Sequence, residues 1–313
     1  MLTVLFATRN GARTLPGVLD SYLKMSVPAG GWKLIIVDNG STDSTPDVVK
    51  SFENKLPLIY LREPAVGKNR ALNKGLDYAE GDLVVLTDDD AYPGENWLAE
   101  LRKVADTQST VSIFSGVVLP LWEMPPEDWI LRLAPKGVSF SLTDPTQREG
   151  PTTADRIFGP NMAIRADVFT KGYRFDASIG PQGINYPMGS ESRLVRQLMK
   201  DGCTAWHCPG AVVEHFVRAG QLKEEWILKR AVRFGRGQYR LNKAANNAAT
   251  KWFGVPRYVY RRMIEQWLRV VLACLTFKKE AIFVARWEFN RLRGEYIEAK
   301  NMTHEADMTA KTV

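Results

Sequence analysis

The first 90 residues alternate between short apolar runs and segments with helical spacing, and this alternation limits the fold more than any other feature. Apolar runs of strand length occupy residues 2–7, 32–37, 58–61 and 81–87. Between them, apolar side chains recur at helical spacing, which predicts helices after residues 14, 45 and 66. Strands that alternate with helices in this way predict an α/β fold with a mostly parallel sheet.

Polar residues follow the predicted strands at their carboxyl ends, where open α/β sheets bind ligands. Thr8, Asp38 and Asp88 occupy three such positions, so we expect them along one edge of the sheet. Residues 88–90 are three consecutive carboxylates, which would repel one another unless a cation lay among them. Asp88 and Asp90 share a face and can offer oxygens to one divalent ion. The alternative is a solvated acidic turn.

The net charge of +7 is unevenly distributed along the 313 residues. Residues 218–300 hold 19 Lys and Arg against 7 Asp and Glu, a net charge of +12, which leaves −5 for the rest of the chain. We therefore divide the chain into a catalytic body at residues 1–217, a basic helical extension at 218–300 and a flexible tail at 301–313. Such a body is long enough to bury a sizeable core.

The chain carries no pattern that predicts export or membrane insertion. The three cysteines form no C-x-x-C pair, so neither a zinc site nor a disulfide framework is indicated, which fits a reducing compartment. The first strand lacks a basic segment before it, so no signal peptide is expected. No uncharged apolar run reaches the roughly 18 residues of a transmembrane helix. The predicted location is the cytoplasm.

The middle of the chain changes in composition. Residues 119–155 are rich in proline, and we expect a long loop over the site with a short helix at 127–133. Trp122 and Trp129 in this loop can stack on the face of a ligand or serve as packing anchors. Further elements are expected as strands at residues 159–165, 205–208 and 211–215 and as helices at 191–200 and within 224–298.

Short motifs occur in a fixed order along the body. They read V-D-N-G-S-T-D at residues 37–43, G-K-N-R-A-L-N at 67–73, D-D-D at 88–90, G-P-N-M at 159–162, G-S-E at 189–191 and P-G-A-V-V-E-H at 209–215. In order and spacing they resemble the motifs of family 2 inverting glycosyltransferases, which have the GT-A fold, a Rossmann-like sheet flanked by helices. The resemblance covers about residues 2–217. It implies a nucleotide-diphosphosugar donor, with a UDP-sugar favoured.

The resemblance also implies a divalent cofactor, Mn²⁺ or Mg²⁺, which stabilises the charge that develops on the leaving diphosphate. Asp90 is then the direct metal ligand, and Asp88 contacts the ribose or the metal through water. His215 resembles the family's C-terminal histidine, which reaches the same metal, although a single histidine is more often structural. His207 has no second ligand at metal spacing, so we interpret it as a strand residue.

Further residues are assigned to the donor by the same resemblance. Asp38 is expected to accept a hydrogen bond from the base, or else to stabilise its own turn. The other predicted contacts to the nucleotide sugar are Thr8, Arg9, Asn10, Lys68, Arg70, Asp88, Asp89 and Asn161. For Lys68 and Arg70 the alternative is ordinary solvated helix charge.

Glu191 is the predicted general base. Inversion by direct displacement needs one carboxylate to take the proton of the acceptor hydroxyl, while the metal-bound diphosphate leaves without a protein acid. The family usually has Glu-Asp where this chain has Ser190 and Glu191, so a longer side chain takes the position of the aspartate. The alternative is a glutamate that favours a helix N-terminus.

The basic extension interleaves its cationic residues with tryptophan and tyrosine. A membrane surface with anionic headgroups, a nucleic-acid patch and a helical dimer face each fit this pattern. We favour the membrane, at its inner face, because the body has no nucleic-acid motif. A homo-oligomer remains the alternative.

The predicted function is transfer of a single sugar to a glycan or a lipid-linked acceptor. A nucleotidyltransferase-like protein of related fold is the alternative, but the G-x-G-x-R start of that class is absent at residues 10–13. A non-catalytic sugar-binding module would be expected to lack Glu191 or the aspartates, and both are present. Processive synthases of the family carry a Q-x-x-R-W motif, which residues 233–238 do not match.

Overall fold

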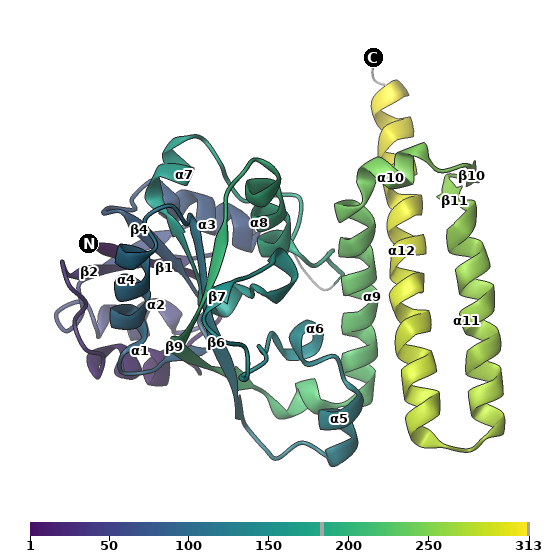
Figure 1. Cartoon of the computed structure of the whole chain (residues 1–313), viewed down its shortest axis with the longest axis horizontal. Helices are drawn as coiled ribbons and strands as arrows, with labels where there is room; N and C mark the ends of the chain where they lie inside the picture. Colours follow the sequence, from purple (N-terminus) through teal and green to yellow (C-terminus); the bar gives the residue numbers. More distant parts are fainter. Residues whose placement is uncertain (182–184, 312–313) are drawn as a thin grey trace. The chain divides into compact units, whose positions relative to one another are not determined.

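A computed structural model describes residues 1–181 and 185–311, and its chain divides into two compact units (Figure 1). The first unit combines Met1–Glu123, Phe140–Ser178 and Ser190–Val217. The second combines Met124–Ser139, Ile179–Gly189 and Arg218–Val313. Each unit therefore draws on separate stretches of the chain.

The first unit is an α/β sandwich around one large sheet. Its strands are β1 (Leu2–Thr8), β2 (Trp32–Asp38), β3 (Leu58–Arg62), β4 (Leu83–Leu86), β5 (Ala91–Pro93), β6 (Ile113–Trp122), β7 (Gly150–Pro151), β8 (Met162–Arg165) and β9 (Ala205–Val217). Its helices are α1 (Leu15–Leu23), α2 (Thr45–Lys50), α3 (Lys68–Leu76), α4 (Trp97–Thr107), α7 (Ala166–Thr170) and α8 (Ser190–Lys200), with short 3₁₀ turns at Ala154–Arg156 and Gly159–Asn161.

The sheet runs in the order β3-β2-β1-β4-β8-β6-β9-β5, and β7 pairs with β9. The four strands β3, β2, β1 and β4 are parallel, as are β6 and β9, whereas β8 and β5 run antiparallel to their neighbours. The predicted α/β class with a mostly parallel sheet is confirmed. Parallel pairing of β1 with β2 sets Thr8 opposite Asp38, so both residues end their strands at one edge.

Alternating residues of the strands face two helical layers, because successive side chains of a strand point to opposite faces. On one face, Leu5 of β1 packs in a buried cluster with α3, α7 and α8, to which Leu72, Val168 and Leu198 belong. On the other side of the sheet, Tyr22 of α1 stacks on Trp32 and meets the edge of Trp97 from α4. The helices packed on both faces hold the strands in place, and with them the residues at the strand ends.

Three details of residues 119–217 differ from the sequence-based expectation. The predicted loop at residues 119–155 is partly wrong, because β6 extends to Trp122 and a helix, α6, forms at Lys136–Phe140. The short helix expected at 127–133 is confirmed as α5 (Asp128–Leu133). The strand expected at 159–165 begins only at Met162, and the two short strands expected after residue 204 are one strand, β9, with an irregular register opposite Gly116 and Val117 of β6.

The second unit is helical and includes α5. Its other elements are a 3₁₀ turn at Ala219–Leu222, α9 (Glu224–Leu241), α10 (Lys243–Ala248), the hairpin strands β10 (Lys251–Trp252) and β11 (Val255–Pro256), α11 (Arg257–Leu275) and α12 (Lys279–Lys311). Helix α12 lies between α9 and α11 (Figure 1). Gly235 and Gly294 allow the close approach of α9 and α12, because a Cβ atom at either residue would lie about 2 Å from a backbone oxygen of the other helix.

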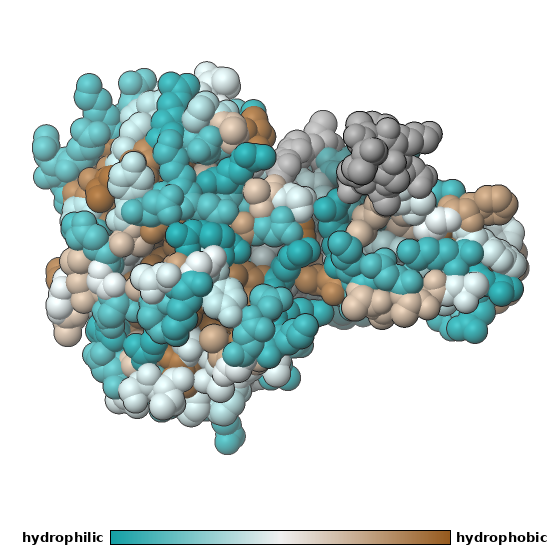
Figure 2. All heavy atoms as spheres, turned by 90° about the horizontal axis from the view of Figure 1, so that it is seen from above, coloured by the Kyte–Doolittle hydropathy of each residue, from teal (hydrophilic) through white to brown (hydrophobic). Residues whose placement is uncertain are grey.

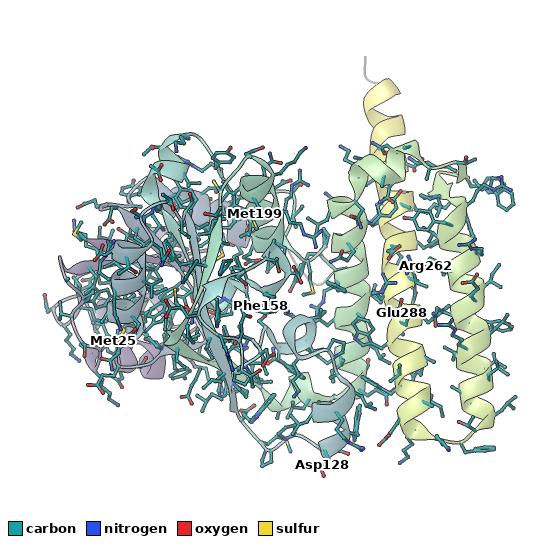
Figure 3. All side chains as sticks on the ribbon, viewed as in Figure 1. Met25, Asp128, Phe158, Met199, Arg262 and Glu288 are labelled. Atoms are coloured by element: carbon teal, nitrogen blue, oxygen red, sulfur yellow. The ribbon has the colours of Figure 1, made fainter. Side chains whose placement is uncertain are left out.

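The surface of the helical unit is not uniformly polar. Figure 2 shows hydrophobic side chains on the side of this unit where α11 lies. Between α11 and α12, Arg262 and Glu288 point toward one another, with 3.9 Å between a guanidinium nitrogen and a carboxylate oxygen (Figure 3). Across the residues that the structure describes, no helix combines the length and the apolar character needed to cross a membrane.

Candidate active site

Asp88, Asp90 and His215 converge at the edge of the sheet where the strands end. Each side chain offers one ligand atom, and these atoms all lie within 4.8 Å of one another. The pairing of β5 with β9 explains the contact, because Ala91 lies opposite His215 in the register and the preceding Asp90 then reaches the imidazole. We call these three residues the acidic cluster. In the described part of the chain, no other group of three or more His, Cys, Asp or Glu side chains converges in this way.

The tautomer of His215 is fixed by the protein. Its Nδ1 lies 2.8 Å from the carbonyl oxygen of Phe140, which can only accept a hydrogen bond, so Nδ1 carries the proton. The other nitrogen, Nε2, lies 3.2 Å from Oδ1 of Asp90. Two acceptors face one another at this distance only if a cation or a proton lies between them. A ring N–H held by a backbone carbonyl is the usual orientation of a metal-binding histidine.

The electrostatics of the cluster agree with this geometry. Burial alone would lower the pKa of His215, but the carboxylates of Asp90 and Asp88 outweigh it and raise the pKa above its ordinary value. The cluster thus attracts positive charge. Oxygen ligands from two carboxylates and one imidazole nitrogen suit Mn²⁺ or Mg²⁺ better than a soft metal, so the residues present fit the divalent cofactor that the sequence motifs imply.

Lys68 joins the acidic cluster to Glu191. Its ammonium donates to Oδ1 of Asp88 and, over 3.0 Å, to Oε1 of Glu191. Burial acts to raise the pKa of Glu191, but the charge of Lys68, the backbone N–H of Glu191 and the hydroxyl of Ser190 together lower it to about 2. Glu191 is therefore ionised. The Lys68 ammonium lies between Glu191 and Asp88 of the acidic cluster, and all three residues belong to the same unit.

Helix α8 begins at Ser190 and presents Glu191 in its first turn. The hydroxyl of Ser190 donates to Oε2 of Glu191 over 2.8 Å, which fixes the carboxylate. Gly159 gives it space, since a Cβ atom at Gly159 would lie 2.9 Å from Oε1 of Glu191. The sequence analysis did not predict these two supporting residues, although both occur in motifs that it quoted.

Side-chain hydrogen bonds hold the turn that follows β1. The hydroxyl of Thr8 donates to Oδ2 of Asp89 over 2.6 Å, so Asp89 is turned toward β1. Asn10 adopts a φ of 54° and is held on both sides, because its N–H donates to Ser41 and its side-chain oxygen accepts from the N–H of Thr42. Thr8, Asn10 and Asp89 thus lie at the strand ends, and their contacts to a nucleotide sugar stay predictions.

Asp38 is fully buried and already holds two hydrogen bonds. Its Oδ1 accepts from the N–H of Ser41 over 2.8 Å, and its Oδ2 accepts from the hydroxyl of Tyr60 over 2.7 Å. The bond to Ser41 is the turn-stabilising role that the sequence analysis gave as the alternative. Tyr60 was missed, because in the sequence it is one aromatic residue of an apolar strand.

Asn161 has a different role from the predicted contact to the donor. The side chain is fully buried, its amide donates to the carbonyl oxygens of Val117 and Ala211, both over 2.9 Å, and its oxygen accepts from the indole of Trp97 over 2.9 Å. Asn161 therefore connects strands and a helix inside the core, and the prediction for this residue is wrong. Arg9 and Arg70 are both exposed, outside the network around the acidic cluster.

Both tryptophans of the proline-rich segment pack against aromatic neighbours. Trp122 meets the edge of Phe140 with 5.5 Å between ring centroids, and Trp129 meets the edge of Phe283 at 4.9 Å. These contacts match the packing role that was the alternative to stacking on a ligand. His207 lies in β9, as predicted, with Nδ1 at 3.2 Å from the hydroxyl of Ser115.

The family is shown by comparison with known proteins. Residues 3–172, more than half of the chain, match the model of glycosyl transferase family 2. The chain therefore belongs to glycosyl transferase family 2. The matched region contains the first four of the motifs described above, and the fold and acidic cluster agree with this assignment.

Relatives of known name are similar over part of their length. A PGL/p-HBAD biosynthesis glycosyltransferase of Mycobacterium bovis is 29% identical over 191 residues, which cover 59% of this chain and 64% of the relative. The chain thus spans slightly less than two thirds of that protein. The poly(ribitol-phosphate) beta-N-acetylglucosaminyltransferase TarS of Staphylococcus aureus is 29% identical over 106 residues, 33% of this chain and 18% of TarS.

Solved structures of glycosyltransferases share the fold. The mannosyltransferase PcManGT from Pyrobaculum calidifontis, in complex with GDP-Man and Mn²⁺, has a TM-score of 0.61 and 19% identity over 94% of this chain and 86% of that chain. TarS residues 1–349 in complex with UDP-GlcNAc have a TM-score of 0.53 and 12% identity over 97% of this chain and 92% of that chain. The predicted GT-A fold with a C-terminal helical extension is confirmed.

Proposed function

We propose that this chain is a metal-dependent inverting glycosyltransferase that moves one hexose from a nucleotide-diphosphosugar to a hydroxyl of a glycan or lipid-linked acceptor. The observation that carries the proposal is the convergence of Asp88, Asp90 and His215, with the ionised Glu191 one ammonium group away. A displacement at an anomeric carbon needs these two functions side by side, one for the leaving diphosphate and one for the attacking hydroxyl.

Asp88, Asp90 and His215 would hold the divalent metal, which would supply positive charge to stabilise the leaving diphosphate. The donor's nucleoside lies along the ends of β1 and β2, where the turn at Thr8 and Asn10 lines the pocket. Asp38 is fully buried and both of its oxygens accept within the protein, so a UDP-sugar is favoured on the motif resemblance alone. Arg9 and Arg70, which are exposed, stay predicted contacts to the donor.

Glu191 takes the proton of the acceptor hydroxyl as its oxygen attacks the anomeric carbon. Its ion pair with Lys68 opposes this step, because the nearby ammonium stabilises the ionised carboxylate. The proposal therefore includes a movement of the Lys68 ammonium from Glu191 toward the anionic donor. The Lys68 ammonium then binds the anionic donor when the donor is present and neutralises Glu191 when the donor is absent.

The named neighbours support a nucleotide-sugar donor without fixing its identity, since one holds GDP-Man and another UDP-GlcNAc. The test is a screen of UDP-, GDP- and dTDP-sugars for thermal stabilisation in the presence of Mn²⁺. A donor at a hundredfold excess over its Kd stabilises the fold by about 2.7 kcal/mol, which raises the Tm by about 5 °C. We expect such a rise with a UDP-sugar and Mn²⁺ and none with either alone. No stabilisation by any of the three nucleotide classes would contradict the proposal.

A further inference from the structure

Helix α11 exposes a stripe of large apolar side chains. The stripe consists of Ile264, Trp267, Leu268, Val271, Leu272 and Leu275. These positions recur at intervals of three and four residues, so they lie on one face of the helix. A contiguous apolar surface of this kind on a soluble unit marks a site of interaction, whereas single exposed apolar residues do not.

The stripe is on the face of α11 that points away from α12. The residues of α11 that are buried in the helical unit are Val259 and Ala273, and they lie half a turn away from Ile264 and Val271 on the helical wheel. Helix α12 packs on α11 from one side only (Figure 1). The helix is therefore apolar on two opposite faces, and only one of them contributes to the core of the unit.

A row of charged residues borders the stripe along one flank. Arg261, Glu265 and Arg269 follow one another every four residues, and all three are exposed. The only carboxylate of the row, Glu265, lies 3.5 Å from Arg261 in an ion pair. From residue 257 to residue 279 the sequence has six Lys and Arg and one Glu, a net charge of +5 for α11 and the turn that leads into α12, although Arg262 faces Glu288 of α12.

Exposed aromatic residues lie near both ends of the same helix. Phe253, at the turn of the β10–β11 hairpin before α11, and Phe277, directly after it, are each 88% exposed. Trp252 stacks with the guanidinium of Arg257, which is 4.3 Å from the ring centroid. Aromatic side chains are favoured at the boundary between lipid and water, where arginine also binds headgroups.

We propose that α11 and its flanking turns are a docking surface for an anionic lipid bilayer, with the helix lying in the plane of the interface. The apolar stripe enters the acyl boundary, and the basic flank meets the phosphate groups of the lipids. The stripe lies next to the basic residues on one helix, so both interactions form in the same orientation. This surface belongs to the helical unit alone and does not depend on the donor or on the acidic cluster.

A second copy of the chain fits the same face less well. An isologous dimer places the same surface on both partners, so two flanks of net positive charge would meet, each with one carboxylate that is already paired with Arg261. Like charges at an interface oppose association. An anionic bilayer instead complements the whole charge of the flank.

The test is sedimentation of the full chain with phosphatidylcholine vesicles that contain or lack phosphatidylglycerol. We expect binding only to the anionic vesicles, weakened at high ionic strength. The double substitution Leu268→Glu/Leu272→Glu should lower the partition coefficient at least about tenfold, because it places charge in the acyl boundary. The matched control is Leu23→Glu/Val27→Glu, an exposed apolar pair of the first unit with the same separation, which should bind as the wild type does.

A second variant distinguishes a loss of membrane binding from a folding defect caused by the first variant. Arg261→Gln/Arg269→Gln keeps the stripe and removes two cationic side chains of the flank, and it should weaken binding to anionic vesicles about tenfold at low salt. The proposal is overturned if the wild type does not sediment with anionic vesicles, or if both double variants of α11 bind as well as the control. A wild-type dimer in sedimentation velocity that Leu268→Glu/Leu272→Glu converts to a monomer, without vesicle binding, would assign the face to a second copy.

Discussion

Two clusters of charged side chains, one in each unit, differ in how they are neutralised. In the helical unit, Glu298 is fully buried and is held by the guanidinium groups of Arg236 and Arg240, so its charge is compensated within the protein. In the first unit, the Lys68 ammonium lies between Asp88 and Glu191, and the imidazole of His215 faces Asp90, so three carboxylates meet one permanent cation and one titratable group. The first arrangement needs no ligand, whereas the second has an excess of negative charge.

This difference in charge compensation indicates that the cluster around Glu298 is structural, whereas the acidic cluster with Glu191 can bind a ligand. Removing one partner from a buried, compensated pair leaves an isolated charge and destabilises the fold. Removing one carboxylate from a group with an excess of carboxylates relieves repulsion and affects ligand binding instead. The two clusters should therefore respond in opposite ways to the loss of a carboxylate, and the predictions that follow test this contrast.

The largest effect is expected for Asp90→Ala. Loss of this carboxylate should lower metal-dependent transfer by about 10³-fold or more, because the charge that stabilises the leaving diphosphate is then not held in place. The unfolding free energy without metal should stay the same or rise. The measurements are steady-state turnover with Mn²⁺ and urea denaturation. Glu214→Gln is the control, since Glu214 precedes His215 in β9 but is exposed, and retained activity in Asp90→Ala would reject the metal assignment.

Glu191→Gln should lower turnover by about 10²- to 10⁴-fold, the usual contribution of a general base. The amide has the shape of the carboxylate, and its single oxygen can still accept from Lys68 while its NH2 can donate to the hydroxyl oxygen of Ser190, so the Kd of the donor should change little. Single-turnover kinetics and donor titration separate the two quantities. A turnover close to that of the wild type would mean that another carboxylate takes the proton.

Glu298→Gln should leave the chemistry of the first unit unchanged and lower the unfolding free energy of the chain by about 3–5 kcal/mol, because the buried Arg236 and the half-buried Arg240 lose the charge of this carboxylate. Thermal and urea unfolding measure the effect. Glu225→Gln is the matched control in the same unit, since its partner Lys229 is exposed and the pair should not affect stability measurably. Equal stability of both variants would show that the helical cluster is not compensated as described.

The smallest effect is a dependence of stability on pH. Lys68 and Ser190 outweigh burial and lower the pKa of Glu191 from 4.5 to about 2 in the folded chain. Because the folded pKa is the lower one, the pair stabilises the fold above about pH 4.5, and this contribution disappears as the pH falls toward 2. The difference in unfolding free energy between the wild type and Glu191→Gln should shrink over this window. A constant difference would contradict the ion pair.

The part of the fold that local patterns determine could be predicted from the sequence. Apolar runs and helical spacing indicated the parallel strands β1 to β4, and the polar residues at their ends located Thr8, Asp38 and Asp88. The extension of β6 to Trp122 and the helix α6 were missed, because prolines at residues 120 and 135 suggested a loop, while pairing with β9 and local packing determined the structure.

The site was harder to predict where a role depends on packing. Asn161 occurs in a motif and looks like a ligand, but burial beneath β6 and β9 uses all its amide hydrogens. In α11, Val259 is buried whereas Trp267 and Val271 are exposed, although all three are apolar. A helix with two apolar faces has no single period that tells which face meets the core.

The central claim is that Asp88, Asp90 and His215 hold a divalent ion together with a nucleotide diphosphate. The most direct measurement is a titration of Mn²⁺ in the presence of UDP, in which electron paramagnetic resonance reports the unbound ion. The account predicts one bound ion for each wild-type chain and a strong loss of affinity in both Asp90→Ala and His215→Ala. Unchanged binding of Mn²⁺ in these two variants would contradict it.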